Sequence, residues 1–133
     1  MTNRGIRGEA LVLDEPLSLW GGLDPATGRI VDARHPQRGA SVSGRVLAMS
    51  AVRGSSSSSS VLAEAVRAGT APLAVLLGER DLILSVGSAV AEELYGVRVP
   101  IVVWPRARLA ALRTGDLVIV ADEAAAGRLA DPR

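Results

Sequence analysis

The amino-acid sequence predicts an α/β fold with a mixed sheet, a β-rich layer and short helices. After Gly44, short apolar runs typical of strands alternate with segments of helical periodicity, an order that produces parallel strands. The first forty residues contain only strand-like and turn-rich stretches. A chain of 133 residues suits a single domain, residues 1–133, and its 48% hydrophobic content comes mainly from aliphatic side chains, which predicts an aliphatic core.

The expected elements follow one another closely along the chain. An opening or edge strand at 9–14 leads into a long structured loop at 20–38, which is rich in Gly and Pro and contains a brief apolar pair at 30–31. We expect the tail at 122–133 to fray. Further strands are predicted at 44–50, 73–77, 82–86, 101–104 and 117–121, and helices around 61–66, at 88–95 before Gly96, and at 106–113.

Charge and hydropathy argue against several classes of protein. The net charge is +1, and every basic residue is an arginine scattered along the chain, so nothing resembles a nucleic-acid-binding footprint. Near the N-terminus, Glu9, Asp14, Glu15 and Pro16 interrupt any apolar run that could serve as a signal peptide or a membrane span. We therefore expect a cytoplasmic protein without membrane or nucleic-acid partners.

The chain contains no cysteine, and this limits its metal chemistry. Disulfides, thiolate zinc sites and an iron-sulfur cluster ligated by this chain are all excluded. His35 is the single histidine, and the carboxylates show no spacing typical of a metal site. Any metal in the reaction must therefore be held by another polypeptide.

Six consecutive serines at 55–60 form the most informative segment. Such a run is most often a flexible linker. Here, however, it lies directly between a predicted strand and an amphipathic helix and follows Arg53 and Gly54, so a strand-to-helix loop is favoured. Hydroxyls and N–H groups at a helix N-terminus bind carboxylate or phosphate, and Arg53 would strengthen that binding. The motif indicates the charge of a ligand but no particular reaction.

Three segments, in this order and at this spacing, form a specific combination. They are residues 16–25 (PLSLWGGLDP) with Thr27-Gly28, then His35-Pro36, and then Arg53-Gly54-Ser55 followed by Val61-Leu62. The pattern continues through Ala71-Pro72 and residues 92–96 (EELYG), up to about Pro105. With this combination the chain resembles the small subunit of the aconitase X family of dehydratases.

The resemblance implies a swivelling β/β/α domain that binds no cofactor itself and docks on a larger aconitase-like subunit carrying an iron-sulfur cluster. It implies a hydro-lyase subunit, inactive without the large subunit, that dehydrates a hydroxy acid. A bacterial version in the family acts on cis-3-hydroxy-L-proline and an archaeal version on mevalonate 5-phosphate. The Ala-rich, Lys-free composition slightly favours the bacterial substrate, and mevalonate 5-phosphate is the alternative.

The resemblance places the family's catalytic serine, the proton acceptor, on Ser55. Because serine is a poor base in water, its alkoxide would have to be favoured by the helix N-terminus, by N–H groups and by Arg53. We expect Arg53, Gly54, Ser56 and Asp24 to contribute to substrate binding.

Other positions invite simpler interpretations. The chain departs from the usual family pattern at Ser50 and Val52, where relatives commonly carry Pro and Gly. His35 before Pro36 is interpreted as a loop residue, and Trp20 either anchors its loop in the core or meets the partner.

Two further function classes remain as alternatives to a catalytic subunit. The serine segment could hold an anion without chemistry, as a binding or regulatory module. A swivelling phosphotransfer domain is less favoured, because the sole histidine is not at a helix start where a phosphate would be stabilised.

Overall fold

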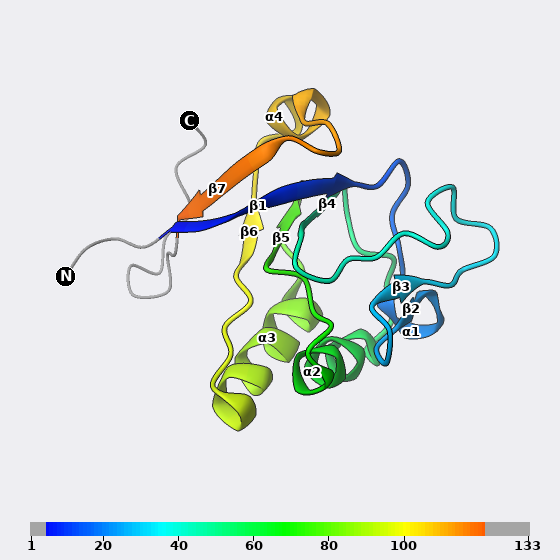
Figure 1. Ribbon diagram of the computed structural model, residues 1–133, viewed down its shortest axis with the longest axis vertical. Coiled ribbons are helices and arrows are strands. Elements are labelled where there is room, and N and C mark those ends of the chain that lie inside the picture. The colour runs from blue at the N-terminus through cyan, green and yellow to red at the C-terminus, as the bar shows by residue number, and fades with distance from the viewer. Residues whose placement is uncertain (1–4, 122–133) are drawn as a thin grey trace.

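The computed structural model describes residues 5–121, in which a five-stranded sheet carries helices on both faces (Figure 1). The strand order is β6-β5-β4-β1-β7; the first four strands in this order are parallel, and β7 is antiparallel to β1. The predicted α/β fold with a mixed sheet is confirmed. The strands are β1 (Gly5–Val12), β4 (Val46–Met49), β5 (Ala74–Leu77), β6 (Ile101–Val103) and β7 (Leu117–Ala121).

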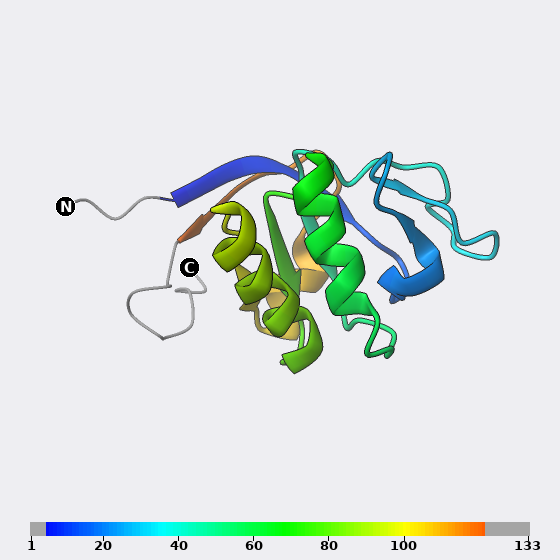
Figure 2. The ribbon, with the colours of Figure 1, turned by 90° about the horizontal axis from the view of Figure 1, so that it is seen from below.

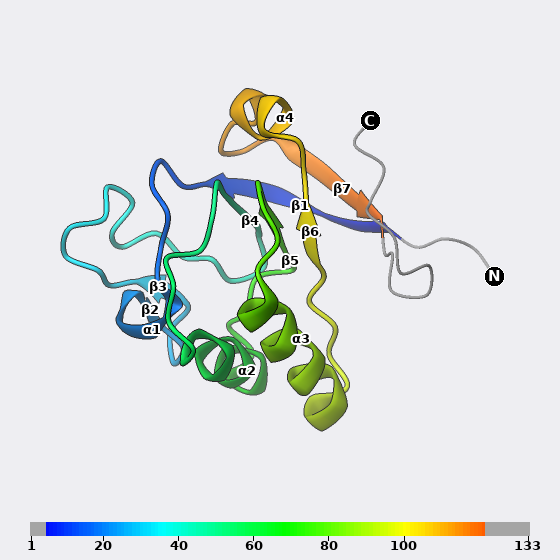
Figure 3. The ribbon, with the colours of Figure 1, turned by 180° about the vertical axis from the view of Figure 1, so that it is seen from behind.

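The helices divide between the two faces of the sheet. α2 (Ser58–Ala68) and α3 (Leu82–Tyr95) pack side by side on one face, and α4 (Arg106–Ala111) lies on the other (Figure 3). A smaller β-rich unit lies beside α2 (Figure 2). It consists of α1 (Leu19–Gly22), β2 (Leu23–Asp24) and β3 (Arg29–Ile30). Within residues 5–121, no helix is long and apolar enough to cross a bilayer.

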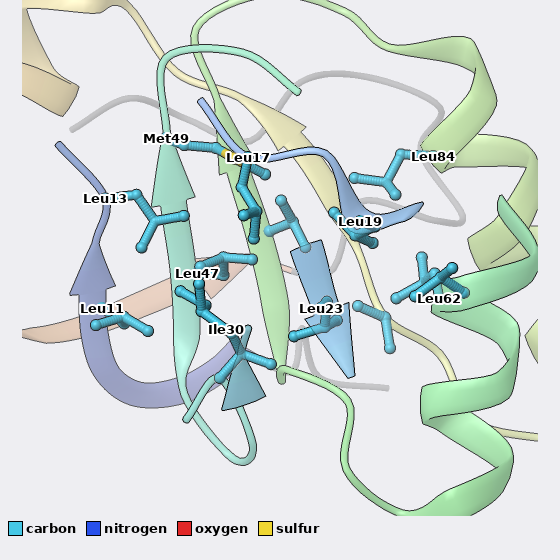
Figure 4. Packing of buried hydrophobic residues seen from close by; sticks show 14 of the residues in the cluster. Leu11, Leu13, Leu17, Leu19, Leu23, Ile30, Leu47, Met49, Leu62 and Leu84 are labelled. Atoms are coloured by element: carbon cyan, nitrogen blue, oxygen red, sulfur yellow. The ribbon is translucent and has the colours of Figure 1, made fainter. Parts of the chain in front are cut away.

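The core is aliphatic, as predicted, and is divided by the sheet. The larger cluster joins the sheet to α2, α3 and the small β-rich unit through residues such as Leu47, Leu62, Leu84 and Ile30 (Figure 4). The smaller cluster lies on the α4 side and contains Trp104, the one aromatic ring in the described core. Because both faces of the sheet are covered, the central strands β4 and β5 are buried at every position.

The predicted strands at 44–50, 73–77, 101–104 and 117–121 are confirmed, with ends shifted by at most two residues. The opening strand covers residues 5–12 instead of 9–14, and it is not an edge strand, because it pairs with β4 on one side and β7 on the other. The predicted loop at 20–38 contains the short elements α1, β2 and β3. The expected frayed tail at 122–133 lies outside the described residues.

The strand predicted at 82–86 is wrong, because these residues form the first turns of α3. The run is almost continuously apolar, so its periodicity does not distinguish a strand from a buried helix. The side chain of Asp81 decides the local structure by accepting a hydrogen bond from the Leu84 N–H at 2.8 Å, a typical helix N-cap. The helix then continues to Tyr95 and stops at Gly96, as predicted.

The β2–β3 turn is fastened to the C-terminal end of α2. The Thr70 hydroxyl, just beyond that end, donates to the carbonyl oxygen of Pro25 at 2.6 Å. Gly28 has a φ of 76°, and a Cβ added there would lie 2.9 Å from the carbonyl oxygen of Thr70 and closer still to the Ser43 hydroxyl. Glycine is therefore required at this position for both conformation and space.

Replacing Gly28 tests this attachment. Gly39 is a matched control, because its φ is also positive, at 91°, but no atom lies within 4 Å of an added Cβ. We expect Gly28→Ala to lower the free energy of unfolding by about 1–3 kcal/mol more than Gly39→Ala, since overpacking adds to the shared backbone cost. Urea denaturation of both variants measures the difference. Equal losses of unfolding free energy would mean that the β2–β3 turn is not packed closely against the C-terminal end of α2.

Candidate functional site

Residues 52–57 lie in the segment that joins β4 to α2 and are here called the serine loop. It leaves the carboxyl end of β4 in the parallel part of the sheet, the edge at which α/β proteins place their ligands. The loop is tied to the chain before α1: Val52 forms a parallel bridge with Leu17, and the Arg53 N–H donates to the Leu17 carbonyl at 3.0 Å. Leu17 is fully buried, so the loop starts from a fixed point in the core.

The two departures from the family pattern are accommodated at this start. Val52 is half-buried and packs against the larger core cluster, and no described residue other than glycine has a positive φ. The carbonyl of Ser50 accepts a hydrogen bond from the Gly78 N–H at 2.9 Å, which links the ends of β4 and β5. A valine in place of glycine therefore needs no unusual backbone here, and its side chain adds a core contact.

Ser55 lies in the turn immediately before α2. Its hydroxyl oxygen accepts a hydrogen bond from the Ser57 N–H at 3.3 Å, and its carbonyl accepts from the Ser58 N–H at 3.0 Å. The side chain is half-buried, so it is held at the helix start yet remains open to solvent. A hydroxyl in this position is close to the positive end of an 11-residue helix.

The serine run is divided between the loop and the helix, which excludes a flexible linker. Ser58–Ser60 form the first turn of α2, and the Ser59 hydroxyl donates back to the Ser56 carbonyl at 3.1 Å. Ser58 is 1% exposed, and its hydroxyl has no hydrogen-bond partner among the described residues. The burial of Ser58 was not predicted, because six identical residues carry no periodicity that could show which one faces inward.

Arg53, Gly54 and Ser56 are the exposed residues of the loop. An added Cβ on Gly54 would meet no atom within 4 Å, and its φ is not in the left-handed region. The fold of the described residues therefore does not require glycine at this position. Arg53, Gly54, Ser55 and Ser56 are consecutive, so the structure brings four of the five predicted site residues together.

Asp24 is the predicted site residue that lies elsewhere. One of its carboxylate oxygens accepts from the Ala26 N–H at 2.9 Å, and its carbonyl accepts from the Gly28 N–H at 2.7 Å, which together close the β2–β3 turn. That turn is attached to Thr70 at the C-terminal end of α2, whereas Ser55 precedes the N-terminal end. Asp24 and Ser55 therefore lie toward opposite ends of α2, a helix of 11 residues that is about 16 Å long.

His35 is a structural residue of the long loop. It is 5% exposed; its Nδ1 accepts from the Gln37 N–H at 3.0 Å, so the proton of the neutral ring is on Nε2, which lies 2.9 Å from the Glu15 carbonyl. Trp20, in contrast, is 61% exposed on α1 and does not anchor its loop in the core.

No cluster of three or more His, Asp or Glu side chains that could hold a metal ion exists within residues 5–121. The arginine at 67 lies on the exposed side of α2, where its hydrogen bonds hold the pKa of Glu64 below the ordinary value. This i, i+3 pair is a surface interaction and lies outside the serine loop.

The contacts of Asp24 predict a structural role that can be measured. Asp24→Asn keeps an acceptor oxygen for the Ala26 N–H, whereas Asp24→Ala removes it. We expect Asp24→Ala to lower the free energy of unfolding by about 1 kcal/mol and Asp24→Asn to change it little. Thermal denaturation of both variants provides the comparison. Equal stability of all three proteins would contradict this role for the carboxylate.

Comparisons with known proteins agree with this geometry. Residues 1–129 match the family model described as the aconitase X swivel domain. The crystal structure of Thermococcus kodakaraensis aconitase X in its holo-form superposes with a TM-score of 0.75 and 31% identity, over 90% of this chain and 88% of that one. The solution structure of a UPF0107 protein superposes with a TM-score of 0.74 and 34% identity, over 91% of each chain.

The relatives include two groups of dehydratases. A cis-3-hydroxy-L-proline dehydratase of Pseudomonas aeruginosa is 48% identical over 94 residues, which are 71% of this chain but only 16% of that protein. A phosphomevalonate dehydratase small subunit of Methanothermobacter thermautotrophicus is 40% identical over 64% of this chain and 65% of its own. The corresponding subunit of Methanopyrus kandleri is 38% identical over 85% of this chain and 80% of its own. This chain therefore belongs to the aconitase X swivel-domain family.

Proposed function

We propose that this chain is the small, swivelling part of an aconitase X-type dehydratase and that Ser55 is its proton acceptor. The observation that carries the proposal is the position of Ser55, half-buried at the start of α2 with a backbone N–H directed at its hydroxyl oxygen. The names of the relatives, which are dehydratases in both groups, support the reaction class. Substrate and partner are part of the proposal, because the matched segment is a small fraction of the hydroxyproline enzymes.

The proposed step is the removal of a proton from carbon in a hydroxy acid. The Ser55 alkoxide takes the proton, and the electrons of the broken C–H bond form the new double bond as the C–O bond breaks. The hydroxyl group accepts a proton from an acid group of the assembled site and leaves as water, and Ser55 then releases its proton to restore the alkoxide. The Ser57 N–H at 3.3 Å and the N-terminal end of α2 both stabilise negative charge on the Ser55 oxygen. Exposed Arg53, two residues before Ser55, adds a positive charge beside the reacting groups and suits a carboxylate substrate.

The iron-sulfur cluster of this reaction class does not fit the side chains of this chain, which has no cysteine. We place it on a larger aconitase-like chain, in agreement with the name "small subunit" carried by several relatives. When bound there, such a cluster supplies Lewis-acid chemistry to the leaving hydroxyl group. What this chain contributes is the base, the charge of Arg53 and the surface on which the substrate is enclosed.

The favoured substrate is cis-3-hydroxy-L-proline, because the identity to the Pseudomonas enzyme is 48%, compared with 40% to the Methanothermobacter subunit. Mevalonate 5-phosphate is the alternative. Both are hydroxy acids with a carboxylate, so both suit a loop that presents Arg53 at a helix N-terminus. Turnover of each compound by the assembled enzyme decides between them.

Replacing Ser55 tests the catalytic role. In the assembled enzyme, we expect Ser55→Ala to lower kcat by at least roughly 100-fold with little change in KM, since a positioned base contributes to the transition state. Folding should survive, because loss of a hydroxyl that accepts a backbone N–H costs about 0.5–2 kcal/mol. Steady-state kinetics and melting temperatures of the same samples provide both measurements.

Ser60→Ala is the matched control, since Ser60 is an exposed serine of the same run, within the first turn of α2. It should retain both turnover and stability. Near-normal kcat for Ser55→Ala, or an equal loss for Ser60→Ala, would favour the anion-binding module over the enzyme.

The isolated chain should fold, remain colourless and show no turnover. The reason is a core buried on both faces of the sheet combined with the absence of cysteine ligands. Visible absorption spectra and dehydratase assays on the purified chain provide the check. Iron-dependent colour or turnover without a second chain would contradict the proposal that the larger chain holds the cluster.

A further inference from the structure

A stripe of exposed apolar side chains runs along α3. Leu82, Val86, Val90 and Leu94 are spaced four residues apart and are 69%, 55%, 42% and 63% exposed, respectively. Residues four apart in a helix are neighbours on its surface, so these side chains form one continuous patch. The opposite side of α3 is already buried through Leu84, Gly87 and Ala91. The helix is therefore apolar on two sides, although only one of them faces the core.

The position of this α3 stripe relative to the serine loop is determined by a backbone contact. A Cβ added to Gly87 would lie 2.7 Å from the carbonyl oxygen of Ser59, so α3 crosses α2 at the second residue of α2. Five residues of α3 precede Gly87, which carries its N-terminal end about 7 Å beyond the crossing. Leu82 and Val86 are in that projecting part. The stripe thus begins beside the serine loop.

Another exposed apolar residue, Trp20, lies on the side of the serine loop that is away from α3. α2 lies between α1 and α3 (Figure 2), and α1 carries the exposed ring of Trp20. The chain just before α1 is bonded to the loop through Leu17 and Arg53. Along the backbone, α1 with Trp20 and the start of the α3 stripe therefore lie on opposite sides of the serine loop, which contains the candidate catalytic residue (Figure 2).

From this arrangement we infer that the α3 stripe, together with Trp20, is the surface on which the larger aconitase-like chain docks. This inference rests on the proposed function, in which that chain must face Ser55. In the Pseudomonas relative the matched segment is 16% of a single longer protein, and other relatives are named small subunits, so a larger body belongs beside this domain in both groups. An apolar recess on that body is the complementary chemistry.

The size of the patch argues against pairing of two copies through the stripe alone. A helix of 14 residues is about 21 Å long and about 10 Å wide, so its outer face covers roughly 200 Å². A stable interface buries about 800 Å² on each partner. The interface must therefore extend beyond the stripe, and we include the serine loop and Trp20 in it, which requires a partner that reaches around the start of α2.

The test uses this chain with the large aconitase-like chain that forms its holoenzyme. Val86→Asp and Leu94→Asp should each raise the Kd of the two-chain complex at least 10-fold, since charge in a desolvated apolar contact is costly. Leu117→Asp is the matched control, because Leu117 is 63% exposed, as is Leu94, but lies on β7 at the opposite edge of the sheet from β6. It should leave Kd unchanged. Circular dichroism checks folding, and calorimetric titration without substrate gives the Kd values.

Kinetics separates this inference from the catalytic proposal. At saturating large chain, Val86→Asp and Leu94→Asp should recover normal kcat, whereas Ser55→Ala should keep the Kd and lose kcat. Unchanged Kd in both stripe variants, or an equal rise for Leu117→Asp, overturns the docking surface even if Ser55 is catalytic. A third outcome also overturns the docking surface: the wild-type chain self-associates, the stripe variants abolish this self-association, and the large chain cannot displace the second copy. The occupant of the stripe would then be a second copy.

Discussion

The approach of α3 to the first turn of α2 is the contact on which the rest of the architecture depends. Gly87 allows the two backbones to meet at Ser59, and any side chain there would have to displace the helix start that follows Ser55. On the other side, the Arg53 N–H is held by the buried Leu17 segment. The serine loop is therefore held at both ends, which gives the half-buried Ser55 hydroxyl a defined position.

In the proposed function, this chain contributes only a few of the groups that the reaction needs. The loop contains the Ser55 hydroxyl, the Ser57 N–H that donates to it, and the exposed Arg53 two residues earlier in the sequence. A hydroxyl group becomes an effective base only in an environment that favours its alkoxide, and an open loop gives part of that environment. In the proposed function, the remainder comes from the exclusion of water by the larger chain that docks over Ser55.

The serine loop and the α3 stripe share one property, which is that the fold of the described residues does not require them. Gly54 has open space around it and an ordinary backbone, and the stripe residues contribute no burial to the described core. Neither feature is explained by the stability of this domain. Gly28 and Gly87, by contrast, are required by contacts within the chain. Exposed residues that the fold does not need, in a loop and along a neighbouring helix, are typical of a surface that contacts a partner.

Sequence patterns alone determined the fold class, most of the strands and the place of the serine run between a strand and a helix, because buried strands and helix faces leave periodicities that can be recognised without coordinates. The resemblance then singled out Ser55 within a run that has no internal pattern. Tertiary structure decided what local signals do not contain: that residues 82–86 continue a helix, that Ser58 is buried, and that Asp24 lies at the far end of α2 from Ser55. The physical reason is that these outcomes depend on contacts between segments distant in sequence, such as Thr70 with Pro25 and Gly87 with Ser59.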